Sequence, residues 1–135
     1  MTTYTEFLTR LGDMRIAGVT RRFGLGQTPP ASLNAGELPA SWVQLPEADH
    51  EAYSFGGGAT WPTFRAQLIV AVLPTAANTL GDSFDKTVAM MDAVRDALEN
   101  ATLAKSAIAW QMKQAVVIVA GAEYWAIVAD IVASG

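Results

Sequence analysis

The sequence predicts a single α+β domain, in which an antiparallel or mixed sheet of about four strands is flanked by two helices. Three observations lead to this prediction. First, 135 residues suit one domain, and 51% of them are hydrophobic while only 16% are charged, a composition typical of a chain that buries a core. Second, two segments have apolar residues at helical spacing, and four have the patterns of strands. Third, a long loop rich in proline and glycine occupies much of the N-terminal half.

The first expected element is a helix over residues 1–17. Thr3 and Glu6 match a capping box, in which each side chain satisfies a free backbone N–H at the helix start. Apolar side chains then recur at helical spacing; these are Tyr4, Phe7, Leu8, Leu11 and Met14. The helix should end before Gly18.

Residues 18–62 are expected to form a long loop with one short strand. Five of the six prolines and the triple glycine at 56–58 lie in this segment, and these residues interrupt regular elements. The short strand is expected at 41–45, where Pro46 ends it. The segment also carries many aromatic and aliphatic side chains, so it should fold over its own domain or pack on a neighbour.

The C-terminal half predicts a strand at 63–73, a helix at 82–100 and a β-hairpin at 108–134. Pro74 ends the strand, and residues 120–122 form the turn of the hairpin. The helix should lie on the sheet through a narrow apolar stripe of Phe84, Val88, Met91, Val94 and Leu98.

Both faces of the predicted strands are mostly apolar, whereas an antiparallel sheet with one helix layer usually has a polar second face. We place five apolar residues on that second face: Ile69, Val116, Ile118, Val128 and Val132. The first helix or the loop covers this face within the chain, or another subunit does. We favour another subunit, because contiguous exposed apolar patches mark interaction sites.

Charge and composition exclude several classes of protein. The chain has no cysteine, which excludes a disulfide framework and a thiolate metal site. Its net charge is −4, and no basic run is longer than Arg21–Arg22, so specific DNA binding is not expected. The longest apolar run, Ala115–Ala122, is too short to span a membrane, and residues 1–5 do not resemble a signal peptide. We therefore expect a cytoplasmic protein with no membrane partner.

The residues that suggest chemistry do not converge on a site. His50 is the one imidazole and lies between carboxylates at 47–51, so it is either a base or metal ligand or, as we favour, a solvated loop residue. Arg21–Arg22 either bind a phosphate or partner carboxylate or are solvated. We expect the remaining candidates to be core anchors or solvated carboxylates; these are Trp42, Trp61, Trp110, Trp125, Asp92, Asp96 and Glu99. We therefore assign no catalytic, cofactor-binding or metal-binding residue, and no cofactor.

The order of the elements is more informative than any motif. A helix is followed by a long loop that contains Glu37–Ala40 and a short strand ending at Leu45–Pro46, then by a strand, a connector with Asn78, a helix and a hairpin containing Val119–Trp125. Over nearly the whole chain this order resembles the tail terminator (minor tail) proteins of long-tailed bacteriophages.

The resemblance implies a non-enzymatic subunit of the virion tail, assembled in the host cytoplasm. Such α+β subunits form a ring homo-oligomer, usually a hexamer, which caps the tail tube and ends its polymerisation. The ring contacts the tail tube protein and a neck or head-completion protein, and DNA passes through its lumen without specific binding. Two alternatives stay open: another neck or tail-tube subunit, and a small oligomeric α+β enzyme or ligand-binding module that uses His50.

Overall fold

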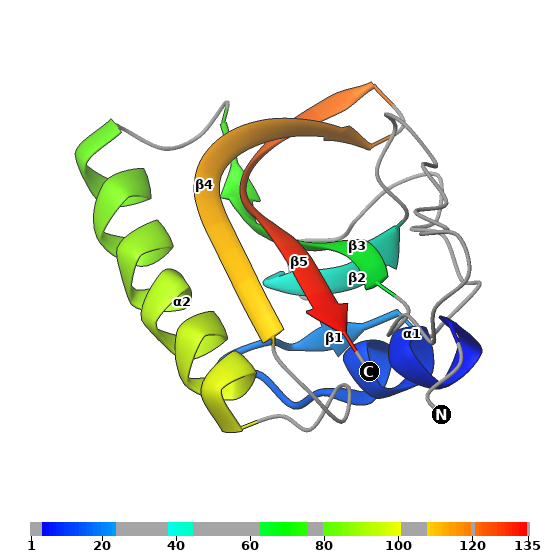
Figure 1. Ribbon diagram of the computed structural model, residues 1–135. Coiled ribbons are helices and arrows are strands. Elements are labelled where there is room, and N and C mark those ends of the chain that lie inside the picture. The colour runs from blue at the N-terminus through cyan, green and yellow to red at the C-terminus, as the bar shows by residue number, and fades with distance from the viewer. Residues whose placement is uncertain are drawn as a thin grey trace, which may run out of the picture.

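The computed structural model describes residues 4–23, 38–44, 63–75, 80–100, 108–119 and 121–134. In this part of the chain two helices and a five-stranded mixed sheet form one α+β domain (Figure 1), which confirms the predicted class with one strand more than expected. The elements in chain order are α1 (Tyr4–Asp13), β1 (Arg21–Arg22), β2 (Ala40–Gln44), β3 (Thr63–Pro74), α2 (Leu80–Asn100), β4 (Ile108–Val119) and β5 (Ala122–Ser134).

The strands lie in the order β1-β2-β3-β5-β4. β1 pairs with β2 in parallel, and all other neighbours are antiparallel. The hairpin β4–β5 turns where Val119 pairs with Ala122, and Gly121 adopts a φ of +86° that a residue with a Cβ rarely adopts. The long strands β3 and β5 are central, whereas β1 and β4 are the two edge strands of the sheet.

The strand β1 lies in the segment where the sequence predicts a loop. The Phe23 amide donates to the Ser41 carbonyl at 2.8 Å, and the Thr20 amide donates to the Pro39 carbonyl, also at 2.8 Å. A strand of two residues has no periodicity of its own, so only the tertiary pairing with β2 reveals it.

The bounds of the helices also differ from the predicted ones. The described part of α1 ends at Asp13 instead of residue 17, and the chain then turns through Gly18, whose φ is +86°. The helix α2 begins at Leu80, two residues before the predicted start. The predicted start of α1 at residues 1–3 lies outside the described residues.

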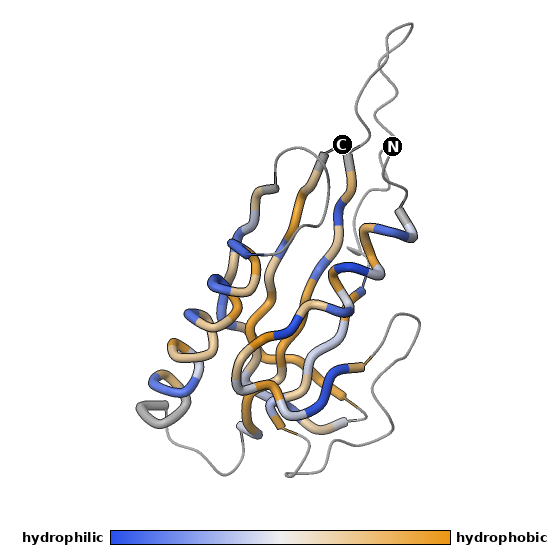
Figure 2. Tube along the Cα trace, turned by 90° about the horizontal axis from the view of Figure 1, so that it is seen from below, coloured by the Kyte–Doolittle hydropathy of each residue, from blue (hydrophilic) through white to orange (hydrophobic). Residues whose placement is uncertain are grey.

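The larger core lies between the two helices and one face of the sheet, called here the helix face (Figure 2). Phe7 stacks on Phe64 with 5.4 Å between ring centroids. From α2, Val94 and Leu98 are fully buried against the side chains that β3 and β5 direct to this face. Burial of these side chains is the main stabilising contribution to the fold.

The second face of the sheet is divided into two halves. In one half Trp42, Ile69, Tyr124 and Val128 are buried in a smaller core together with Phe23. β4 and β5 are strongly curved, and their hairpin end arches toward β2 and β3 (Figure 1). The other half is polar. Burial within the chain therefore accounts for much of the apolar surface that the sequence assigned to another subunit.

The prediction for the second face is wrong for two of its five residues, which lie on the helix face. Val116 pairs with Trp125 and Ile118 pairs with Glu123, which places both on the helix face together with Trp125 and Ile127. Ile69 and Val128 do lie on the second face, but inside the chain's own core. Val132 is half-buried beside the polar half.

Candidate functional site

The structure does not bring the predicted chemical candidates together. His50 and its neighbouring carboxylates at 47–51 lie outside the described residues, as do the triple glycine at 56–58 and Trp61. Of the other tryptophans, Trp42 lies on the second face, whereas Trp110 and Trp125 pack on the helix face. These three side chains therefore do not form one aromatic cage.

Asp92, Asp96 and Glu99 of α2 are exposed, as the sequence predicts for a solvated helix face. Asp96 has Arg95 at 3.7 Å in an exposed ion pair, which adds little to stability. Among the described residues no three His, Cys, Asp or Glu side chains are grouped closely enough to hold a metal ion. Neither helix of the described chain is long and apolar enough to cross a bilayer.

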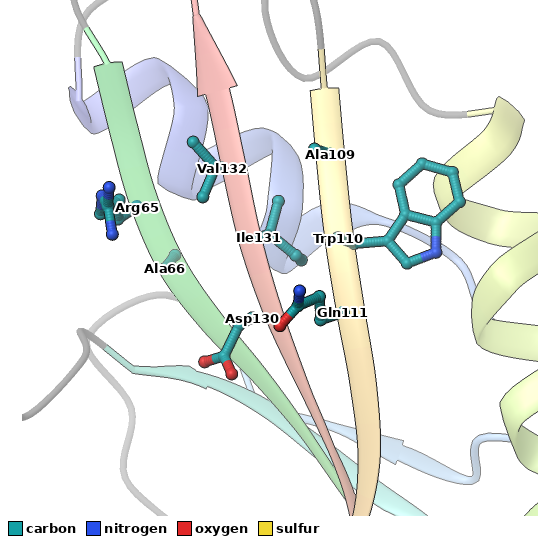
Figure 3. A pocket seen from close by; sticks show the side chains of 8 residues that line it. All are labelled: Arg65, Ala66, Ala109, Trp110, Gln111, Asp130, Ile131 and Val132. Atoms are coloured by element: carbon teal, nitrogen blue, oxygen red, sulfur yellow. The ribbon is translucent and has the colours of Figure 1, made fainter.

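A hollow of about 480 Å³, lined by both polar and apolar side chains, lies at the polar half of the second face (Figure 3). It lies near the start of β3, the start of β4 and the end of β5, and Arg65, Gln111 and Asp130 supply its polar groups. The register aligns Gln111, Asp130, Gln67 and Gln44 in one row across four strands. No sequence motif indicates this row, because its members come from strands that are far apart in the chain.

Hydrogen bonds run through this row in one direction. The Gln67 side-chain amide donates to the Asp130 carboxylate at 2.8 Å, and the Gln44 amide donates to the Gln67 carbonyl oxygen at 3.0 Å. An ionised carboxylate only accepts hydrogen bonds, so Asp130 fixes the orientation of Gln67 and, through it, of Gln44. The row thus ties three strands together, and its residues do not include a nucleophile of the Ser, Cys or Lys type.

The most unusual surface of the described chain is a strip of large exposed apolar side chains. Phe84 is 59% exposed, Val88 40%, Val116 44% and Ile118 68%. We call these four residues the outer strip. The sequence predicted that Phe84 and Val88 pack on the sheet, but in the structure the buried side of this half of α2 is formed by Thr87 and Met90.

A hydrogen bond joins the two elements that carry the outer strip. The Gln114 amide donates to the Thr87 hydroxyl at 3.3 Å, which ties β4 to the first half of α2. The two elements run in opposite directions, and beyond Gln114 β4 bends away from α2 toward the hairpin end (Figure 1). The outer strip therefore consists of two exposed apolar pairs, Phe84 with Val88 on α2 and Val116 with Ile118 toward the hairpin end of β4.

The outer strip borders the unpaired side of β4. This strand is last in the sheet order and, within the described chain, pairs only with β5. Its outward backbone N–H and C=O groups can accept another strand, and an unprotected side of this kind favours association. The combination of twelve strand residues with adjacent apolar side chains is typical of an interface and not of a solvated surface.

The edge strand at the opposite end of the sheet, β1, is short and basic. β1 consists of Arg21 and Arg22, both exposed. The Arg22 guanidinium donates to the carbonyls of Asp13 and Met14, at 2.8 and 3.4 Å, and so caps the end of α1. Arg21 lies over the Phe23 ring at 4.9 Å from its centroid. Both side chains are exposed, as expected for a solvated pair, but the capping and the ring contact were not expected from the sequence.

The fold and its surfaces define a small α+β domain with a mixed sheet, in which the edge strand β4 is unpaired on its outer side and carries exposed apolar side chains. Comparison of the chain with protein families, with curated proteins and with solved structures finds no match.

Proposed function

We propose that this chain is a structural virion protein that forms a ring, caps the tail tube of a long-tailed bacteriophage and ends its polymerisation. The observation that carries the proposal is the outer strip beside the unpaired side of β4. A protein that works alone rarely exposes such a surface, whereas a ring subunit covers it with its neighbours. The order of the elements along the chain, which resembles that of tail terminators, supplies the particular role.

The ring would contact the tube on one side and a neck or head-completion protein on the other, with DNA passing through the lumen. We propose a function in assembly, without catalysis by this chain. Another neck or tube subunit is the second candidate, because it would also need an interface of this kind.

The test measures self-assembly and tube capping together. Purified protein is examined by sedimentation velocity between about 1 and 100 µM and by negative-stain microscopy, and is then added to polymerising tail-tube protein from the same genome. We expect closed rings and an arrest of tube growth. Open polymers of the chain itself would favour a tube subunit instead, and a monomer at every concentration that leaves tube growth unchanged would contradict the proposal.

Two matched variants locate the effect. Ile118→Lys places a charge in the outer strip and should prevent ring formation, because an unpaired lysine would be buried at the interface. Ala89→Lys introduces the same side chain on an exposed position of α2 outside the strip and should leave the rings intact. Both proteins should show the far-UV circular dichroism of the parent chain.

A further inference from the structure

The two edges of the sheet, each with the helix that lies near it, carry opposite charge. Residues 4–23, which contain α1 and β1, hold four arginines against Glu6 and Asp13. Residues 80–100, which form α2, hold five carboxylates against Lys86 and Arg95. α1 and α2 pack on the same face of the sheet but near its opposite edges (Figure 2), which are formed by β1 and β4. We call these two regions the basic side and the acidic side.

On the acidic side the charges lie beside the part of the outer strip that α2 contributes. Val88, Asp92 and Glu99 are four and seven residues apart, so they share one side of α2, and all three are exposed. Lys86, Ala89 and Met90 line a different hollow together with Gly18 and Leu38. The carboxylates and the apolar residues therefore face the same way, outward from the β4 side of the molecule.

On the basic side there is a small hollow that suits a carboxylate. It has a volume of about 280 Å³ and is lined by Arg15, Thr20, Arg22 and Ser41, among others. The Ser41 side chain is only 2% exposed, and its hydroxyl has no hydrogen-bond partner in the described part of the chain. Buried hydroxyls are almost always hydrogen-bonded, and an arginine held in place by backbone carbonyls, as Arg22 is, is a ready donor to an anion.

We propose that copies of this chain associate head to tail, with the acidic side of one copy against the basic side of the next. Carboxylates of α2, Asp92 and Glu99 first, face the hollow of Arg15 and Arg22, and Phe84 and Val88 are covered at the same contact. The inference rests on the self-assembly proposed above and specifies its geometry. A contact between two different surfaces closes into a ring when the rotation between copies permits.

The charge distribution favours this arrangement over a two-fold pairing of β4 with β4. A two-fold contact would bring two acidic helices together, and like charges across an interface cost free energy. In the head-to-tail contact each carboxylate meets an arginine. The two arrangements therefore predict different effects for substitutions on the basic side, which lies outside a β4–β4 contact.

The experiment exchanges the charges. One variant carries Arg15→Glu and Arg21→Glu, a second carries Asp92→Lys and Glu99→Lys, and a third carries all four substitutions. Arg65→Glu, an exposed arginine on the second face, is the matched control. Arg22 is left in place because it caps α1. Assembly is measured by sedimentation velocity at low and high salt, and folding by circular dichroism and thermal unfolding.

Each double variant alone should associate at least about tenfold more weakly than the parent chain, because repulsion replaces attraction. An equimolar mixture of the two should assemble again, since each reversed side meets its reversed partner. The chain with all four substitutions should assemble alone for the same reason. High salt should weaken assembly of the parent chain, whereas Arg65→Glu should not.

The outcomes separate this inference from the proposed function. If the parent chain forms rings but the arginine variant assembles equally well, the contact does not use the basic side, and the proposed function stands. If both double variants lose assembly and neither the mixture nor the fourfold variant regains it, the pairing of these two sides is also wrong. A parent chain that stays monomeric at every concentration and salt would contradict both proposals.

Discussion

The two halves of α2 are built from similar residues but are used differently. In the second half Val94 and Leu98 are fully buried in the core, whereas in the first half Phe84 and Val88 stay exposed. The second half contributes to the stability of the single chain. The first half presents apolar surface that the chain itself does not cover, so one amphipathic helix serves both the fold and, as we propose, an interface.

The largest expected effect tests the buried half. Leu98→Ala removes a side chain with 0% exposure and should lower the free energy of unfolding by about 3 kcal/mol, because the cavity does not fully collapse. Val88→Ala in the exposed half should cost less than about 1 kcal/mol. Urea unfolding at concentrations where the chain is monomeric measures both values, and equal effects would remove the distinction between the halves.

The second prediction tests the exposed half. The double substitution Phe84→Ser and Val88→Ser should leave the monomer nearly as stable as before but weaken self-association at least about tenfold, because central apolar side chains dominate interface energies. Sedimentation equilibrium measures the association. Ala89→Ser, on the same helix but outside the strip, is the control. A loss of monomer stability with association unchanged would show that the two side chains belong to the fold.

The smallest effect concerns the tie between α2 and β4. Gln114→Ala removes the hydrogen bond to Thr87 and should cost at most about 1 kcal/mol. Amide hydrogen exchange should quicken in the first half of α2 and remain unchanged near Val94 and Leu98. Gln111→Ala, on the same strand but the other face, should leave the exchange of α2 unaltered. Faster exchange along the whole helix would mean that its two halves open together.

Much of the fold could be predicted from the sequence, because long elements carry their own pattern. The period of α2 and the alternation in β5 were enough to place both, including the faces of Trp125 and Asp130. The two-residue strand β1 was not predictable, since its pairing with β2 depends on tertiary contacts.

The surface was harder to predict than the fold. Helical spacing shows that Phe84 and Val88 share a side with Met91, but not how far that side extends beyond the sheet. Val116 and Ile118 were assigned to the wrong face because the pairing of β4 with β5 decides it. The basic hollow requires Arg15, Arg22 and Ser41 to meet from three segments, which no spacing in the sequence indicates.

The row through Gln44, Gln67 and Asp130 has a consequence for how reliably the chain folds. Sliding β5 along β3 by two residues would keep every apolar side chain on its own face, so hydrophobic patterning does not distinguish the correct alignment from the slipped ones. In one slipped alignment Asp130 would lie beside Ile69 in the smaller core, where an unpaired carboxylate is strongly penalised. In the other, Val128 would face Gln67 and Asp130 would lie opposite Arg65, so the hydrogen bond between Gln67 and Asp130 would be lost. The buried carboxylate thus disfavours one slipped alignment, and the broken row of hydrogen bonds disfavours the other.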